Sequence, residues 1–204
     1  ASIGSRRLPT CRARLAGRRV TPTHLVGRAL AHALAEVPEL NVQIRGGYAH
    51  PRESIDVFEV DTRAAPPSLT WVGCVIAPGS IGLNSVRGLA DGGFITTNWL
   101  PRGGAQDAMQ EMMAGEKNGE LWEWHTASGW QKVPGSEAAG ANGIELSDDG
   151  KTIFMAAWGS QSFIRLSRGV TPVKRDELPL GFRIDNIHFA RDGGLIGAGQ
   201  ITDP

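Results

Sequence analysis

The sequence predicts a mainly β protein, in which about three blades of a β-propeller follow an N-terminal amphipathic helix. One reason is a segment pattern that occurs three times between residues 84 and 200 and is typical of strand, tight turn, strand. The other is a change in composition near residue 50. Residues 1–52 hold nine Arg against two acidic residues, whereas residues 53–204 hold twelve basic against nineteen acidic residues and all six Trp. We therefore predict a basic arm and helix at 1–48 and a partial propeller at 49–204.

The predicted helix lies within residues 21–38. Thr21 suits the N-cap, Pro22 suits the first helical position, and Pro38 ends the run. Apolar residues recur between them at steps of three and four, namely Leu25, Val26, Ala29, Leu30, Ala33 and Leu34. This spacing indicates one amphipathic helix of about four turns. We expect the Arg-rich stretch before it to be a solvated basic arm.

The repeat begins each time with an amide or carboxylate side chain, at Asn84, Asn142 and Asp185. Each of these residues is followed seven and eight positions later by an Asp-Gly pair, which favours a tight turn between two strands. The copies lie 58 and 43 residues apart, a distance that suits blades of four short strands. Further strands are predicted at 55–60, 70–76, 120–125 and 162–166.

Residues at one repeat position of a propeller point toward the same central channel, because each blade places its innermost strand there. Asn84, Asn142 and Asp185 should therefore converge, and Asn186 could add a further oxygen. Amide and carboxylate oxygens in a polar channel are typical ligands of Ca²⁺, with another divalent cation as the alternative. Each residue taken alone also suits an Asx turn at a strand start. The matched position in three repeats favours the metal.

Two motifs resemble those of the family of senescence marker protein/gluconolactonases and paraoxonases. The stretch Asn142-Gly143-Ile144 with Ser147-Asp148-Asp149-Gly150-Lys151 resembles the family's Asn-Gly-Ile … Ser-Pro-Asp-Gly-Lys signature, and Asp185-Asn186 resembles its Asp-Asn pair. Asp148 stands where proline is usual. The resemblance implies a six-bladed propeller, a calcium ion held by Asn142, Asp185 and Asn186, and hydrolysis of a small ester or lactone.

The same resemblance extends upstream. Leu83-Asn84-Ser85 resembles a Leu-Asn-Asp motif whose Asn binds the catalytic calcium, with Ser85 in place of the usual Asp. Residues 49–61 resemble a paraoxonase segment in which His50 corresponds to the second histidine of a proposed dyad, so His50 is the predicted catalytic residue. The family's first blade should precede residue 49, and further blades should follow residue 204. We therefore expect impaired activity and open sheet edges that favour self-association.

Residues 18–48 resemble the start of the catalytic domain of the dihydrolipoamide acyltransferases of 2-oxo acid dehydrogenase complexes. The family's HxxxDG motif is absent from the sequence, so acyl transfer is not expected. The functional hypotheses are a calcium-dependent hydrolase of esters or lactones, then a non-catalytic propeller that serves as an interaction scaffold, then an acyltransferase fragment.

Composition and the remaining motifs give further expectations about partners, location and the loops. The formal net charge is zero, which argues against nucleic-acid binding by bulk charge. No apolar run is long enough for a membrane span, and no signal peptide is visible. The sequence does not indicate the cellular compartment. We expect an ordinary loop around Met109, Met112 and Met113, with a short helix or lid as the alternative. His125 should face solvent, and His188 should flank the proposed site.

Overall fold

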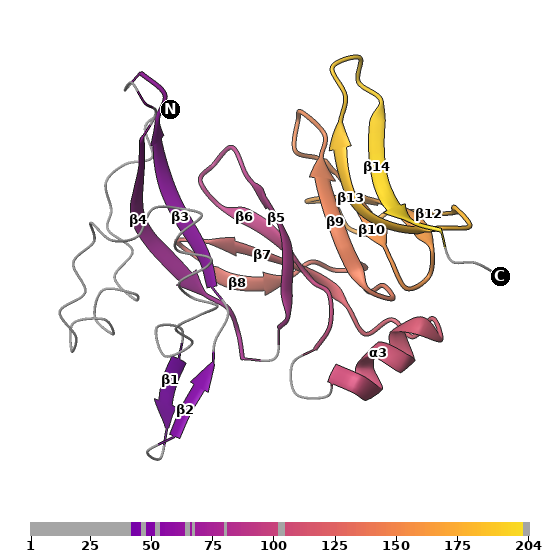
Figure 1. Ribbon diagram of the computed structural model, residues 1–204. Helices are drawn as coiled ribbons and strands as arrows, with labels where there is room; N and C mark the ends of the chain where they lie inside the picture. The colour runs from indigo at the N-terminus through magenta and orange to yellow at the C-terminus, as the bar shows by residue number, and fades with distance from the viewer. Residues whose placement is uncertain are drawn as a thin grey trace. The chain divides into compact units, whose positions relative to one another are not determined.

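The computed structural model describes residues 42–45, 48–51, 54–63, 66, 68–79, 81–101 and 105–201, and Figure 1 shows their arrangement. By internal contacts the chain divides into two units, Ala1–Gly79 and Ser80–Pro204, which are treated separately below. The helix predicted at 21–38 and the basic arm lie outside the described residues. The boundary predicted between residues 48 and 49 stays a prediction.

The first unit contains two antiparallel strand pairs. Strand β1 (Val42–Arg45) pairs with β2 (Tyr48–Pro51), and β3 (Ser54–Asp61) pairs with β4 (Ser68–Ile76). The indole of Trp71 donates a hydrogen bond of 3.0 Å to the Asp56 carboxylate across β3 and β4. These strands confirm the predictions at 55–60 and 70–76.

The second unit is built from antiparallel sheets whose strands follow one another in chain order. One sheet has the order β5-β6-β7-β8, another has the order β9-β10-β11-β12, and β13 pairs with β14 (Figure 1). The strands are β5 (Leu83–Gly88), β6 (Phe94–Asn98), β7 (Glu120–His125), β8 (Gly129–Lys132), β9 (Ala141–Leu146), β10 (Thr152–Ala157), β11 (Ser162–Ser167), β12 (Arg175–Pro179), β13 (Arg183–Phe189) and β14 (Leu195–Gln200). Four antiparallel strands in chain order form a propeller blade. The described part of this unit therefore holds two blades and the first strand pair of a third, which confirms the mainly β, propeller-type fold.

The Asp-Gly pairs form the same turn in all three repeats. In each turn the Asp carboxylate accepts a hydrogen bond from the amide two residues later, and the glycine after the Asp has a positive φ that other residues rarely adopt. The bonds are Asp91–Gly93 (3.2 Å), Asp149–Lys151 (3.0 Å) and Asp192–Gly194 (3.0 Å), and the glycines are Gly92 (φ 90°), Gly150 (φ 66°) and Gly193 (φ 85°). The predicted strand-turn-strand repeat is confirmed.

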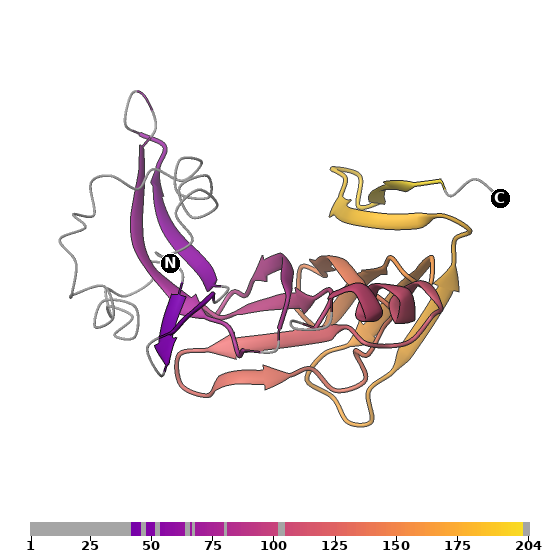
Figure 2. The same cartoon turned by 60° about the horizontal axis from the view of Figure 1, so that its bottom comes forward.

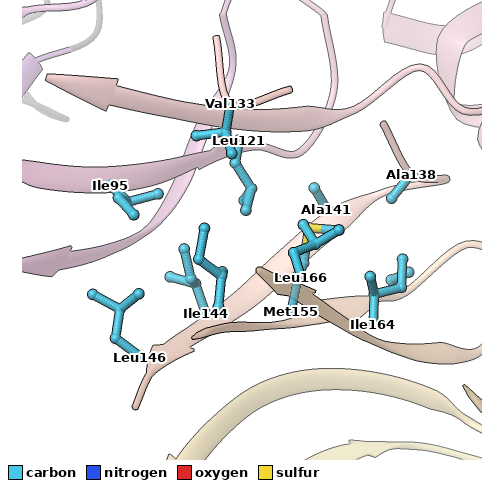
Figure 3. Close-up of a cluster of buried hydrophobic side chains, with 12 residues drawn as sticks. Ile95, Leu121, Val133, Ala138, Ala141, Ile144, Leu146, Met155, Ile164 and Leu166 are labelled. Atoms are coloured by element: carbon cyan, nitrogen blue, oxygen red, sulfur yellow. The ribbon is translucent and has the colours of Figure 1, made fainter. Parts of the chain in front are cut away.

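The main core lies between the first and second blades (Figure 3). Ile95 and Leu121 come from the first blade, whereas Ile144 and Leu166 come from the second, and each is at most 5% exposed or fully buried. Strand β10 alternates between two cores, because Ile153, Met155 and Ala157 enter this cluster while Phe154 and Ala156 pack with Ile184 and Ile187 of β13. The second blade is thus buried on both faces, as a blade between two neighbours must be.

Helix α3 (Ala105–Met113) stands between β6 and β7, where we expected a loop. Ala108 and Met112 are four residues apart and are both buried, so they form its packing face. Met112 lies against Gly140 and Gly159, which precede β9 and follow β10. Figures 1 and 2 show the position of α3 in the ribbon. Gly115, with φ 94°, closes the helix, since the amides of Gly115 and Glu116 bond the carbonyls of Met112 and Glu111. The expectation of an ordinary loop was wrong, and the short helix, which we weighed as the alternative, is what forms.

Candidate functional site

Each innermost strand carries a β-bulge at the start of its repeat. In the first repeat Leu83 pairs with Asn98 and Val86 with Thr96, so two residues of β5 face one residue of β6. The registers of β9 with β10 and of β13 with β14 shift in the same way. The bulged pairs are Asn84–Ser85, Asn142–Gly143 and Asp185–Asn186, which include all four predicted metal ligands. Bulges redirect side chains and are common next to active sites.

The bulge in β5 is stabilised by two threonines of β6. The Ser85 amide donates a 2.8 Å hydrogen bond to the Thr97 hydroxyl, and the Thr96 hydroxyl donates a 2.7 Å bond to the Ser85 carbonyl. Both threonines are 0% exposed. These hydroxyls replace the ladder bonds that the extra residue interrupts, so the bulge is a fixed element of the strand.

The three bulges lie close together on neighbouring innermost strands. Strand β9 contacts β5 on one side and β13 on the other. A Cβ added to Gly143 would come within 2.4 Å of the Asp185 carbonyl oxygen, so the backbones of β9 and β13 nearly touch at their bulges. The Ser85 hydroxyl lies 3.5 Å from the Asn186 amide oxygen, which links β5 to β13. The bulged segments of the three innermost strands are therefore neighbours, while the convergence of the predicted ligand side chains stays a prediction.

The predicted ligands differ in exposure and in partners. Asn142 is 3% exposed, and its Oδ1 is buried without a hydrogen-bond partner in the part of the chain that the structure describes. Asp185 is half-buried, and its Oδ1 accepts a 3.0 Å bond from the Asn186 amide group. Asn84 and Asn186 are exposed. A buried acceptor without a donor needs a water or a cation to satisfy it, so this residue set fits a hard cation.

A second layer of polar residues lies three positions further along the innermost strands. Arg87, Glu145 and His188 follow Asn84, Asn142 and Asp185 at the same interval, and they contact one another. Arg87 Nε lies 3.0 Å from Glu145 Oε2, and His188 Nδ1 lies 3.0 Å from Glu145 Oε1. The structure places His188 on β13 beside the bulge, but the partnership with Arg87 and Glu145 was not anticipated. The shared repeat position was the signal that could have revealed it.

The strand ends beside the bulges carry an aromatic rim. Trp99 and Trp158 follow β6 and β10, and their rings meet edge to face at 6.2 Å. Trp158 Nε1 donates a 2.9 Å bond to Gln200 at the end of β14. The Arg183 guanidinium stacks 4.5 Å above Trp158 and donates to the backbone carbonyls of Trp158 and Gly159. Trp99 Nε1 and Arg183 Nε are buried without partners among the described residues, as Asn142 Oδ1 is.

We also made predictions for His50 and His125. The backbone of His50 belongs to β2, and its side chain lies outside the described residues, so its catalytic role stays a prediction.

His125 was expected to face solvent, but its side chain is only 26% exposed and contacts Asp91 and Glu123. Burial would raise the pKa of Glu123, but hydrogen bonds from Arg168 and His125 outweigh it and lower that pKa. Through Arg168, which follows β11, this cluster links β7 of the first blade to the second blade.

The metal and membrane predictions can be compared with the described residues. Within the described part of the chain, no group of three or more His, Cys, Asp or Glu side chains is placed to hold a metal, so a cation at the bulges would depend on amide oxygens. None of the described helices is long and apolar enough to cross a membrane.

Comparisons with known proteins give structural likeness only. No protein-family model matches the chain, and no curated protein matches it. Among solved structures, an inactive variant of virginiamycin B lyase from Staphylococcus aureus with quinupristin matches at 14% identity and a TM-score of 0.45, over 78% of this chain and 47% of that one. A luciferin-regenerating enzyme matches at 16% and 0.47, over 78% and 54%. A putative 6-phosphogluconolactonase from Bacteroides uniformis matches at 11% and 0.41, over 69% and 41%. The chain thus spans about half the length of the structures it resembles, and its propeller class rests on its own sheets.

Proposed function

We propose that the channel binds Ca²⁺ and that the protein belongs, by activity, to the calcium-dependent hydrolases of esters or lactones. The observation that carries this proposal is the coincidence of the predicted ligands with three equivalent β-bulges. The motif resemblance around Asn142 and Asp185 had pointed to the same residues independently of the register.

Asn84, Asn142, Asp185 and Asn186 would hold the cation, and the buried Oδ1 of Asn142 is the acceptor that most needs one. When bound, Ca²⁺ supplies Lewis-acid polarisation of a carbonyl oxygen and stabilisation of developing negative charge. Carboxylate and amide oxygens suit this cation better than a soft metal.

The chain's own residues fix the geometry of this site before any ligand arrives. The Asn186 amide donates to Asp185 and so orients one oxygen of that carboxylate, while the other oxygen has no hydrogen bond from the described residues. Thr96 and Thr97 hold the β5 bulge, and the burial of Asn142 restricts its rotamers. Fixed dipoles of this kind favour charge development at one place without reorganisation.

The test is calorimetric titration of Ca²⁺ into the full chain and three variants. Asn142→Ala and Asp185→Ala should weaken binding at least tenfold, because each removes a ligand. Asp192→Ala is the matched control, since it removes an exposed Asp from the turn at the other end of the β13–β14 hairpin. Wild-type protein that binds no Ca²⁺, or variants that bind as the wild type does, would refute the site.

A screen of aryl esters and lactones, with and without EDTA, then tests the activity. Hydrolysis that EDTA abolishes and that Asn142→Ala removes would support the hydrolase. Calcium binding with no turnover of any ester or lactone would instead favour the non-catalytic scaffold.

A further inference from the structure

We propose that Arg87 binds an anionic group of the substrate, so that the preferred substrates are esters or lactones bearing a carboxylate or phosphate. The inference rests on the proposed hydrolase and names a feature of its substrate. It is carried by the Arg87–Glu145–His188 layer, which neither the motif resemblance nor the predicted metal site includes.

Only the Nε atom of the Arg87 guanidinium has a partner among the described residues. Its Nε contacts Glu145 Oε2 at 3.0 Å, and no other hydrogen bond of its side chain is found within the described residues. The side chain is 48% exposed. Two terminal nitrogens are therefore free to present the forked donor geometry that matches a carboxylate or phosphate.

Glu145 acts as the positioning residue of this layer. Its side chain is 4% exposed, a costly environment for a carboxylate unless cations and hydrogen bonds compensate. Its two oxygens are shared between Arg87 on β5 and His188 on β13, one to each. A buried anchor that reaches both neighbouring strands fixes the direction of Arg87 better than a flexible surface partner would.

The position along the channel fits a bifunctional substrate. Arg87 lies three residues beyond Asn84, and Glu145 lies three beyond Asn142, which corresponds to about 10 Å of strand. An ester group at the bulges and an anionic group near Arg87 would thus belong to one extended molecule. His188, with a side chain that is 79% exposed, lies beside the same stretch.

The test compares monomethyl suberate, which keeps one carboxylate, with dimethyl suberate, which is neutral. The wild type should hydrolyse the monoester with a kcat/KM at least tenfold higher, through a lower KM, because the free carboxylate meets Arg87. Arg87→Gln should lose this preference, and Arg87→Lys should retain part of it. Arg165→Gln is the control, since Arg165 is also exposed and paired, with Asp176 on β12.

Calorimetric binding of suberate supplies a readout that needs no turnover. The inference is supported if the wild type and Arg165→Gln bind suberate and Arg87→Gln binds it at least tenfold more weakly. This holds even if no ester is hydrolysed. In that case only the proposed hydrolase activity fails. An unchanged monoester preference in Arg87→Gln overturns it, and so does suberate binding that Arg87→Gln leaves intact. Should Arg87→Gln not fold, Arg87→Lys decides: a partial loss of monoester preference and of suberate binding supports the inference, and unchanged values of both overturn it.

Discussion

Substituting Gly143 by alanine should force apart the innermost strands β9 and β13 where their backbones lie close together. Gly143 lies in the β9 bulge beside Asn142. Its added Cβ would meet the Asp185 carbonyl oxygen at 2.4 Å, the Asn186 Cα at 2.8 Å and the Ile187 amide nitrogen at 2.9 Å. All three atoms belong to the backbone of β13, so no side chain can rotate away to make room.

The size of the effect follows from these distances. Ordinary van der Waals contacts of a Cβ begin near 3.4 Å, so β9 and β13 must separate by about 1 Å at the bulge. Overpacking of this kind costs about 1–3 kcal/mol of folding free energy. Because Asn142 and Asp185 flank the strained contact, we expect calcium affinity to fall at least tenfold as their oxygens move apart.

The assay is urea unfolding together with calorimetric titration of Ca²⁺. Gly88→Ala is the matched control, because Gly88 ends innermost strand β5 and an added Cβ there meets nothing within 4 Å. Gly88→Ala should be neutral in both measurements. If Gly143→Ala were as stable as the wild type and bound Ca²⁺ equally well, the close approach of the bulges would not be a feature of the protein in solution.

Two further substitutions test the contacts that join the blades. Arg168→Met removes two hydrogen bonds to Glu123 (2.6 and 2.9 Å) and should cost about 1–2 kcal/mol in urea unfolding at pH 7. Because the folded-state pKa of Glu123 is lowered, this contribution is complete above its unfolded pKa and disappears as pH falls through the folded value, so a difference that persists in acid would contradict it. Met112→Ala leaves a void against Gly140 and Gly159 and should cost about 2–5 kcal/mol, and a loss below 1 kcal/mol would mean that α3 is not packed there.

The repeat was predictable because its signals are local. An Asp-Gly pair after an alternating strand demands a turn with a positive φ at the glycine, and Gly92, Gly150 and Gly193 adopt it. The strands at 120–125 and 162–166 could likewise be predicted from the alternation of apolar and polar residues, and they form β7 and β11. Fully buried strands give a weaker signal, as β9 shows, since every residue of it is buried and its Glu145 looks like a surface position in the sequence.

Helix α3 was weighed only as the alternative to an ordinary loop, although the sequence held its signals. Ala108 and Met112 stand four residues apart, and Gly115 follows as a helix terminator, but the insertion is short and lies between two strands of one blade. A helix of nine residues is marginal by its own propensity. Its formation depends on the burial of Met112 against loops that belong to the next blade, which no local pattern reveals.

The repeat position carries more information than the type of residue that fills it. Asn84, Asn142 and Asp185 are chemically alike, so their equivalence was visible in the sequence. Arg87, Glu145 and His188 are unlike, and of these only His188 was noted, as a residue flanking the site. A channel brings together side chains of equal position whether or not they match, and unlike charges satisfy one another there better than three copies of one residue would. At the rim, Trp158 just after β10 likewise contacts Trp99 just after β6 and Gln200 at the end of β14. In a propeller, dissimilar residues at the same repeat position can therefore contact one another. Such contacts are visible when the repeats are aligned, but not when only similar residues are compared.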